Sequence, residues 1–271
     1  MQPILVTGGA GVLGRLVVKH LSAAGYPARG MSRRARPGEN WPGAEWVQAD
    51  LETGEGIEAG VEGAEIIVHC AGSVKGDEQK TLNLVQAASR AGARHLVYIS
   101  VVGADRIPVK SSVDRAMFGY FASKLATERV VAESGLPWTT LRATQFHDAI
   151  LTVARAMAKL PIVPVFAGFR FQPVDADEVA ARLVQLALGE PAGLVPDLGG
   201  PRAYPMAELL RSYLHAMHKQ RLILPVRLPG QAARAHRAGA NLTPDHANGR
   251  RTWEEFLANH VGLPSVVTAE M

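Results

Sequence analysis

Tyr120 and Lys124 stand four residues apart in a segment that reads as the start of a helix, "YFASKLATERVVAES". Side chains at positions i and i+4 share one helix face, so the phenol and the ammonium can point into the same site. A neighbouring ammonium favours the phenolate and lowers the phenol pKa from its usual value of roughly 10. Such a pair can move a proton to or from a carbonyl or alcohol oxygen while a nicotinamide carries a hydride. The spacing is a weak signal by itself, because a tyrosine and a lysine on an amphipathic helix are commonly surface residues.

A second cluster of residues indicates what would lie beside this pair. The stretch "ILVTGGAGVLGR" (residues 4–15) has an apolar run before its glycines and apolar residues at helical spacing after them. A strand, a glycine turn and a helix in this order predict a dinucleotide site, because the helix N-terminus offers free N–H groups and a partial positive charge to a pyrophosphate. We expect Gly8 to allow the tight turn, Gly11 the close approach of phosphate, and Gly14 the packing of helix against strand. The alternative is a glycine-rich turn without a ligand.

The residues at the end of the second predicted strand indicate whether the site would prefer NAD(H) or NADP(H). A carboxylate there would bond the ribose 2′-OH and repel a 2′-phosphate, but the sequence reads Met31, Ser32, Arg33, Arg34. A hydroxyl and guanidinium groups suit a phosphate, so Ser32 and Arg33 favour NADP(H) over NAD(H). We interpret Arg34 and Arg36 as solvated basic residues.

The elements that must position these groups follow an alternating pattern. Strand-like runs alternate with helical segments, the clearest helix being residues 80–92, and this predicts a parallel, doubly wound sheet of the α/β Rossmann type. The remaining strands are predicted at residues 26–33, 44–51, 64–72, 95–103 and 137–146. We expect residues 1–146 to form the dinucleotide-binding core. Residues 147–271 would complete the sheet and form a smaller substrate lobe.

Several polar residues allow two interpretations. Asp50 and Leu51 close the third strand, where an adenine could rest, although Asp50 also suits a turn. His69 and Cys70 are predicted to be buried packing groups, and they lack partners at metal-ligand spacing, so no metal is expected. Asp175 and Glu178 have the spacing of a capping box and are interpreted as the start of a helix.

The second half of the chain offers aromatic candidates. Phe166, Phe169 and Phe171 crowd an apolar loop that could be a substrate lid or part of the core. His147 either lies near the substrate cleft or is an ordinary hydrogen-bonded group. Trp253 and Phe256 stand at i and i+3, a spacing that predicts a docking face for the last helix.

Composition narrows the class of protein. The 271 residues include 29 Lys and Arg against 25 Asp and Glu, and this mild excess does not indicate a nucleic-acid partner. A single cysteine, Cys70, excludes an internal disulfide and fits a reducing compartment. The chain enters a predicted strand directly and has no apolar run of membrane-spanning length, so we expect neither a signal segment nor a spanning helix. We therefore expect a cytoplasmic protein that acts on a small molecule, without a nucleic-acid or membrane partner, and a homodimer is possible.

Taken together, "TGGAGVLG", Asp50-Leu51, the "AG" of residues 71–72 and "YFASK" resemble the short-chain dehydrogenase/reductase superfamily. The stretches "HLVYISVVGAD", "KLATERVV" and "LPWTTLRATQFHD" resemble its atypical, extended NmrA-like branch of NAD(P)-binding proteins. The resemblance implies a Rossmann fold, Lys124 on the nicotinamide ribose, and backbone of Thr144 to Phe146 at the nicotinamide end. It implies further cofactor contacts by Thr7, Gly8, Gly11, Val12, Leu13, Gly14, Ser32, Arg33, Asp50, Leu51, Ala71 and Gly72.

One position departs from the family pattern. Catalytically competent relatives carry a Ser or Thr just past the fifth strand to bind the carbonyl oxygen, and here Ser100 is followed by Val101 and Val102. Loss of such a donor costs on the order of 10²–10³ in rate, unless Ser111 or Ser112 substitutes. The main hypothesis is an NADP(H)-dependent reductase of a small carbonyl or quinone-like compound, with Tyr120 as general acid. The alternatives are an NADP(H)-binding redox sensor without turnover, and a nucleotide-sugar epimerase or dehydratase.

Overall fold

The computed structural model describes residues 1–33, 44–72 and 76–261. A seven-stranded parallel sheet forms the central layer of the larger of its two parts. In spatial order the strands are β3 (Ala44–Gln48), β2 (Ala28–Ser32), β1 (Ile4–Thr7), β4 (Ile66–His69), β5 (His95–Val101), β6 (Trp138–Ala143) and β9 (Gly193–Leu194). All seven residues of β5 are buried, as expected for a central strand of a sheet covered on both faces. The predicted Rossmann-type fold is confirmed, and each predicted strand range contains an observed strand.

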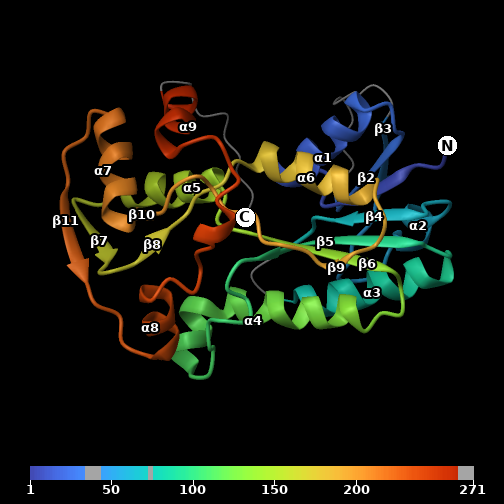
Figure 1. Cartoon of the computed structure of the whole chain (residues 1–271), viewed down its shortest axis with the longest axis horizontal. Helices are drawn as coiled ribbons and strands as arrows, with labels where there is room; N and C mark the ends of the chain where they lie inside the picture. Colours follow the sequence, from blue (N-terminus) through green and yellow to red (C-terminus); the bar gives the residue numbers. More distant parts are fainter. Residues whose placement is uncertain (34–43, 73–75, 262–271) are drawn as a thin grey trace.

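Helices cover both faces of this sheet (Figure 1). One face carries α1 (Val12–Ala23) and α6 (Ala176–Ala187). The other carries α2 (Ile57–Val61), α3 (Asp77–Arg90) and α4 (Ser112–Ala132). The helix that holds Tyr120 begins at Ser112, which is earlier than the sequence indicated, because Ser111 and Asp114 form a reciprocal capping box there. Tyr120 therefore lies in the third turn of a long helix rather than at its start.

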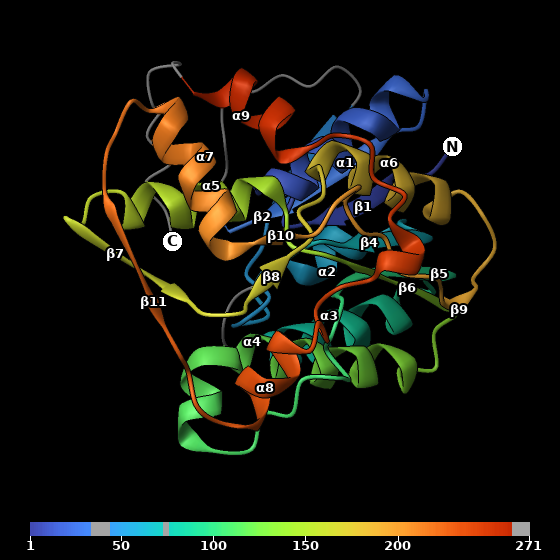
Figure 2. The same cartoon turned by 60° about the vertical axis from the view of Figure 1, so that its left-hand side comes forward.

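The remaining elements build a lobe with its own hydrophobic core at the other end of the molecule (Figures 1 and 2). They are α5 (His147–Met157), β7 (Ile162–Phe166), β8 (Arg170–Phe171), β10 (Tyr204–Pro205), α7 (Met206–Ala216), β11 (Leu222–Val226), α8 (Gln231–Arg237), a 3₁₀ turn (Pro244–His246) and α9 (Trp253–His260). The chain enters this lobe after β6, returns to the large sheet for α6 and β9, and then enters the lobe again. The lobe is thus assembled from two separate stretches of sequence.

Trp253 and Phe256 seat the last helix on the lobe core, as predicted. Both residues are buried, and the indole nitrogen of Trp253 donates to the carbonyl oxygen of Leu209 and to Oγ of Ser212. His147 stacks on both rings, and its Nε2 lies 3.1 Å from the carbonyl oxygen of Arg251. Burial lowers the pKa of His147, so this residue is the hydrogen-bonded packing group of the two possibilities considered.

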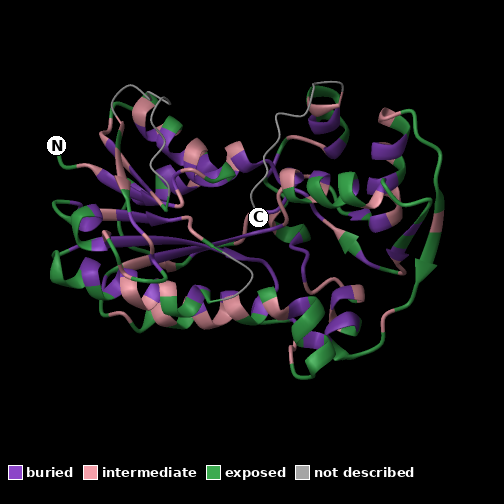
Figure 3. Cartoon of the chain, turned by 180° about the vertical axis from the view of Figure 1, so that it is seen from behind, coloured by how far each residue is buried: buried purple, intermediate pink, exposed green. Residues whose placement is uncertain are grey.

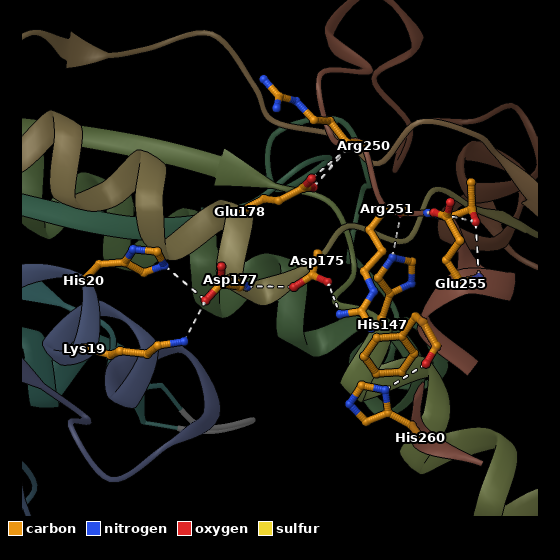
Figure 4. A network of polar contacts seen from close by, with 12 residues as sticks. Lys19, His20, His147, Asp175, Asp177, Glu178, Arg250, Arg251, Glu255 and His260 are labelled. Atoms are coloured by element: carbon orange, nitrogen blue, oxygen red, sulfur yellow. Dashed lines mark hydrogen bonds and ion pairs between the residues drawn. The ribbon is translucent and has the colours of Figure 1, made fainter. Parts of the chain in front are cut away.

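Polar contacts at the start of α6 join the sheet to the lobe (Figure 4). Asp175 caps α6 by accepting a hydrogen bond from the backbone N–H of Asp177, and its other oxygen accepts from Arg251 at 2.8 Å. Asp177 in turn lies 3.1 Å from Nε2 of His20 on α1. The predicted role of Asp175 as a helix cap is confirmed.

Glu178 lies in the first turn of α6, as the predicted helix start requires, but it does not complete the capping box. A capping box would require its carboxylate to accept from the N–H of Asp175, whereas it accepts from the backbone N–H of Arg250 at 2.9 and 3.1 Å (Figure 4). The spacing alone could not reveal this, because the competing donor comes from a segment 72 residues away. Glu178 therefore holds the C-terminal segment against α6.

Candidate active site

The strand order places a topological switch point between β1 and β4, and the carboxyl edge of the sheet at this point is called the crevice below. Strand order runs from β1 to β3 in one direction and from β4 to β6 in the other, so the connections that leave β1 and β4 diverge to opposite faces. In open α/β sheets, ligands bind at such a switch point. The glycine turn after β1 and the pair Ala71-Gly72 after β4 line this place.

The glycine turn leaves no room for a side chain at two of its positions, Gly8 and Gly14. Gly8 has a φ of +65°, and a Cβ on it would lie 2.8 Å from Cα of Ala71. A Cβ on Gly14 would overlap the carbonyl oxygen of Gly8. Gly11 differs, because its Cβ would meet only that same oxygen, at 3.2 Å. Gly8 and Gly14 therefore have the turn and packing roles predicted for them.

Helix α1 begins with the exposed residues Gly11 and Val12 and carries no negative group in its first turn. Gly11 is the N-cap, no side chain caps the helix, and its first turn contains no acidic residue. No described residue accepts a hydrogen bond from the backbone N–H of Val12, Leu13 or Gly14. These donors, together with the helix dipole, form a site suited to an anion.

A buried ammonium lies on the β4 side of the crevice. Nζ of Lys124 donates to the hydroxyl of Tyr98 at 3.2 Å and lies 3.5 Å from Oδ2 of Asp77, and all three residues are buried. A Cβ on Gly72 would approach this ammonium to 3.1 Å, so Lys124 lies directly behind Gly72. Burial lowers the pKa of Lys124, and the carboxylate of Asp77 opposes that shift.

Tyr120 lies near this ammonium, but its acidity differs from the expectation. Nζ of Lys124 is 5.8 Å from the centre of the Tyr120 ring, and the ammonium donates its hydrogen bond to the hydroxyl of Tyr98 instead. Loss of water around the phenol raises the pKa of Tyr120 to about 12, and the negative charge of Asp77 is the second cause. The residue as a whole keeps 40% of its surface exposed. The expected lowering of this pKa is therefore wrong, because burial of the phenol and then the charge of Asp77 both raise it.

Asp77 and Tyr98 are the functional candidates that the sequence reasoning missed. Asp77 is the first residue of α3, where an acidic residue normally reads as a favourable partner of the helix dipole. Tyr98 lies within the apolar run of β5 and reads as core. A buried lysine needs a carboxylate nearby as its counter-charge. Once Lys124 is assigned to the site, this requirement is the signal in the sequence that could have pointed to Asp77.

His69 helps to hold β1 and β4 together beside the crevice. Its Nδ1 lies 2.7 Å from Oγ1 of Thr7, its Nε2 lies 3.0 Å from Oγ1 of Thr81, and its ring stacks on Tyr98. Burial and then the Lys124 charge lower the pKa of His69 to about 3, so the imidazole is neutral. Thr7 also accepts from the backbone N–H of Ala71 at 3.2 Å.

The region expected to hold the adenosine end is more open. Arg33 is exposed and Ser32 is half-buried at the end of β2, while Arg34 and Arg36 lie outside the described residues. The carboxylate of Asp50 accepts a hydrogen bond from the backbone N–H of Glu52 at 2.8 Å. This contact is typical of a turn residue, which was one of the two interpretations of Asp50. These contacts leave the guanidinium of Arg33 accessible.

The serines expected to assist Tyr120 do not reach it. Ser100 is buried, and its hydroxyl makes no hydrogen bond to a described residue. Ser111 accepts from the backbone N–H of Asp114 as the cap of α4, while Ser112 is exposed at the first position of that helix. No described serine thus contacts the phenol.

Other predicted residues have structural partners. Thr144 is buried and its Oγ1 accepts from the backbone N–H of Gly200 at 3.3 Å, whereas Phe146 is half-buried and caps α5. Leu51 is buried, and its carbonyl oxygen accepts from the side chain of Asn83. Cys70 differs from these residues and from its prediction, because it is a free thiol of intermediate exposure; desolvation raises the pKa of this thiol to about 12.

The three phenylalanines belong to an aromatic cluster of the lobe. Phe169 is buried and stacks on His236 at 4.2 Å, and Phe166 and Phe171 are half-buried around it. Burial lowers the pKa of His236 to about 4, as expected for an imidazole among apolar rings. Phe169 is therefore a core residue.

Two kinds of feature are absent from the described part of the chain. Within residues 1–33, 44–72 and 76–261, His, Cys, Asp and Glu side chains form no group that could hold a metal ion. Within the same ranges, none of the helices has the length and apolar character required to span a bilayer.

Comparisons with known proteins agree with this geometry. A family model described as NAD(P)H-binding matches residues 8–187. A ceramide reductase of Caulobacter vibrioides is 30% identical over 245 residues, which cover 83% of this chain and 73% of that protein. An NAD(P)H azoreductase of Xenophilus azovorans is 27% identical over 212 residues, covering 76% and 71%.

Among solved structures, the NADPH-dependent quinone oxidoreductase QOR2 of Escherichia coli, complexed with NADPH, superposes with a TM-score of 0.75. That match covers 95% of this chain and 99% of QOR2 at 20% identity, so it supports the fold. The chain spans only about a fifth of the length of several mycobacterial relatives, which are 28% identical over 193 residues.

Proposed function

The chain belongs to the NAD(P)H-binding family, and from that premise we propose that it is an NADP(H)-dependent reductase of a small carbonyl or quinone-like compound. The observation that carries the proposal is the pairing of an uncapped helix N-terminus with a buried ammonium across one crevice. Val12, Leu13 and Gly14 would hold the diphosphate through their backbone N–H groups, and Lys124, behind Gly72, would hold the nicotinamide ribose. The names of the reductase relatives support this reaction class.

The residues near Lys124 suit proton donation to a substrate oxygen. When bound, the nicotinamide cofactor supplies the hydride. The raised pKa of Tyr120 keeps its phenol protonated at neutral pH, which is the form that a reduction requires. Asp77 and Tyr98 hold the ammonium of Lys124 in place, so they act as positioning residues. A group protonated before the reaction can give its proton to the developing alkoxide.

Cofactor binding is tested by a single glycine substitution. Gly14→Ala adds a Cβ that overlaps the carbonyl oxygen of Gly8, so the turn must shift and the N–H groups lose their common direction. We expect isothermal calorimetry to show NADPH affinity reduced about tenfold or more, which corresponds to roughly 1.4 kcal/mol. Gly189→Ala is the matched control, because its Cβ would make only ordinary contacts beyond 3.4 Å. Absence of NADPH binding by the unmodified chain would refute the proposal.

The preference for the phosphorylated nucleotide is a separate prediction. Arg33 is exposed at the end of β2, and we expect Arg33→Asp to weaken NADPH binding by about 10–150-fold, the equivalent of one charge-assisted hydrogen bond of roughly 1.5–3 kcal/mol. NADH affinity should stay the same or rise, because the new carboxylate can accept from the ribose 2′-OH. Parallel titrations with both nucleotides measure this, and Arg94→Asp, an exposed change before β5, is the control. A preference of the unmodified chain for NADH would contradict the assignment.

One observation favours a second candidate function. The hydroxyl of Ser100 is buried without a hydrogen-bond partner, and no described serine is hydrogen-bonded to the phenol of Tyr120. A protein that binds NADP(H) and responds without turnover would not need a serine donor beside the tyrosine. NADPH binding without oxidation by any quinone, aldehyde or ketone of a broad panel would favour this function.

A further inference from the structure

Two segments of the lobe contain no acidic residue. Residues 149–174 and 209–244 together hold 62 residues without a single Asp or Glu. Their basic residues are Arg155, Lys159, Arg170, Arg211, Lys219, Arg221, Arg227, Arg234 and Arg237. The other 209 residues hold 20 Lys and Arg against all 25 Asp and Glu, so the positive charge of the chain is concentrated in these two segments.

These nine cations also lack carboxylate partners. None of them forms an ion pair with an acidic residue anywhere in the described chain, and all except Arg237 are exposed. Cations of the sheet region are frequently paired, as Arg90 is with Glu58 and Arg142 with Glu128. The charge of the lobe is therefore available to an anionic surface.

An apolar face lies among these cations. The ribbon formed by β7 and β11 pairs Leu222 with Ile162 and Leu224 with Pro164 in parallel register, and all four side chains are exposed. Leu222 is 64% exposed and Leu224 is 50% exposed. The opposite face of the ribbon packs on the lobe core, so the outward face is the one that normally carries polar residues. Figure 3 shows β11 as an exposed strand at the end of the molecule away from the large sheet.

Charges stand at both ends of this apolar face. Lys159 precedes β7, Lys219 and Arg221 precede β11, and Arg227 follows it. A hollow of about 620 Å³ at the beginning of the ribbon is lined by Lys159, Pro161, Gln220, Arg221 and Leu222. Exposed aliphatic side chains next to unpaired cations are the combination found on proteins that lie on anionic lipid headgroups.

We propose that the β7–β11 ribbon and its flanking cations form a peripheral binding surface for an anionic phospholipid bilayer. Leu222 and Leu224 would enter the headgroup boundary, while Lys159, Arg221 and Arg227 contact lipid phosphates. A spanning segment is not needed for such attachment, so this surface departs from the expectation of no membrane partner. The surface is separate from the crevice between β1 and β4 and does not depend on the proposed reaction.

Two other occupants fit the surface less well. A second copy of the chain would bring two faces of the same positive charge together, and Pro225 removes a backbone donor from the outer strand, which disfavours edge-to-edge pairing. Single-stranded nucleic acid is held by aromatic stacking, but Leu222, Leu224, Ile162 and Val226 are aliphatic. An apolar, non-aromatic face with excess positive charge is matched better by lipid.

The test is flotation of the full chain with phosphatidylcholine vesicles that contain either no anionic lipid or about 30% phosphatidylglycerol. We expect binding to the anionic vesicles only, and weakening by salt. The double variant Arg221→Gln/Arg227→Gln should reduce the partition coefficient about 30-fold. This factor follows from a binding free energy of roughly 1 kcal/mol for each cation near an anionic bilayer. Leu222→Ser/Leu224→Ser should reduce it about tenfold or more. Retained NADPH affinity and thermal unfolding establish that each variant is folded.

The controls remove the same groups from elsewhere. Arg94→Gln/Arg129→Gln takes two exposed cations from the sheet region, and Val113→Ser/Met117→Ser takes two exposed apolar residues from α4. Both should bind anionic vesicles like the unmodified chain. The proposal would be overturned by equal binding to neutral vesicles or by an equal loss of binding in the controls. It would also be overturned by binding to a DNA oligonucleotide that depends on the arginines but not on the leucines. A dimer in light scattering that the leucine variant dissociates would overturn it as well.

Discussion

Replacing Tyr120 with phenylalanine should lower kcat for NADPH-dependent reduction by about 10²–10⁴-fold, the range for loss of a general acid. The NADPH dissociation constant should remain unchanged, because the cofactor is held by the α1 N-terminus and by Lys124 rather than by the phenol. Stopped-flow absorbance of NADPH with a quinone or aldehyde that the unmodified chain reduces would measure the first quantity, and calorimetry the second. The pKa of about 12 also predicts no loss of rate from phenol ionisation between about pH 7 and pH 10.

Tyr26→Phe is the matched control, since it removes a hydroxyl from the turn after α1, away from the crevice. It should alter neither constant. A Tyr120→Phe variant that turns over at the unmodified rate would assign proton donation to another group or to water. That result would leave cofactor binding, which Gly14→Ala tests, unaffected.

Replacing Arg142 with methionine should lower the free energy of unfolding by about 3–5 kcal/mol, the cost of removing one partner from a buried ion pair. The guanidinium makes two hydrogen bonds to Glu128, at 2.8 and 2.7 Å, and lies 2.8 Å from Oδ2 of Asp105. Both Arg142 and the carboxylate of Glu128 are almost fully buried, and the substitution leaves that carboxylate without a counter-charge. Urea unfolding followed by circular dichroism measures the loss.

The control for Arg142 is a pair of the same chemistry at the surface. Arg90 and Glu58 are each more than 60% exposed, so Arg90→Met should cost less than about 1 kcal/mol. Arg142→Met combined with Glu128→Leu should recover much of the stability, because no buried charge is left unpaired. A cost for Arg142→Met as small as that for Arg90→Met would show that water reaches Glu128 after the substitution.

The large sheet was predictable because its signals are local. The apolar runs of β1, β4 and β5 are short and separated by helical periodicity. The steric limits on Gly11 and Gly14 come from Gly8 and Gly9, within the same turn. The lobe was less predictable. Its strands β8 and β10 have two residues each, and β7 pairs with β11 across some 60 residues of sequence. Such pairings depend on tertiary packing, which periodicity does not report.

The candidate site was predictable in its positions more than in its chemistry. Spacing placed Tyr120 and Lys124 on one helix, and both lie near the crevice. The Tyr120 pKa is raised first by burial of the phenol and then by the charge of Asp77, which is 43 residues away in sequence. Both causes arise from tertiary packing, which the spacing of Tyr120 and Lys124 does not report. Likewise, Ser100 reads as a site residue by position, while its burial is a property of the folded sheet.

The late return of the chain to the sheet has a consequence for biosynthesis. Helix α6, which covers one face together with α1, and the edge strand β9 both follow residue 175 in sequence. During translation, the apolar side of the earlier strands that α6 will cover stays open to solvent until residues 176–187 have left the ribosome. Nascent chains stalled before that length should recruit holdase chaperones, and those stalled after it should release them.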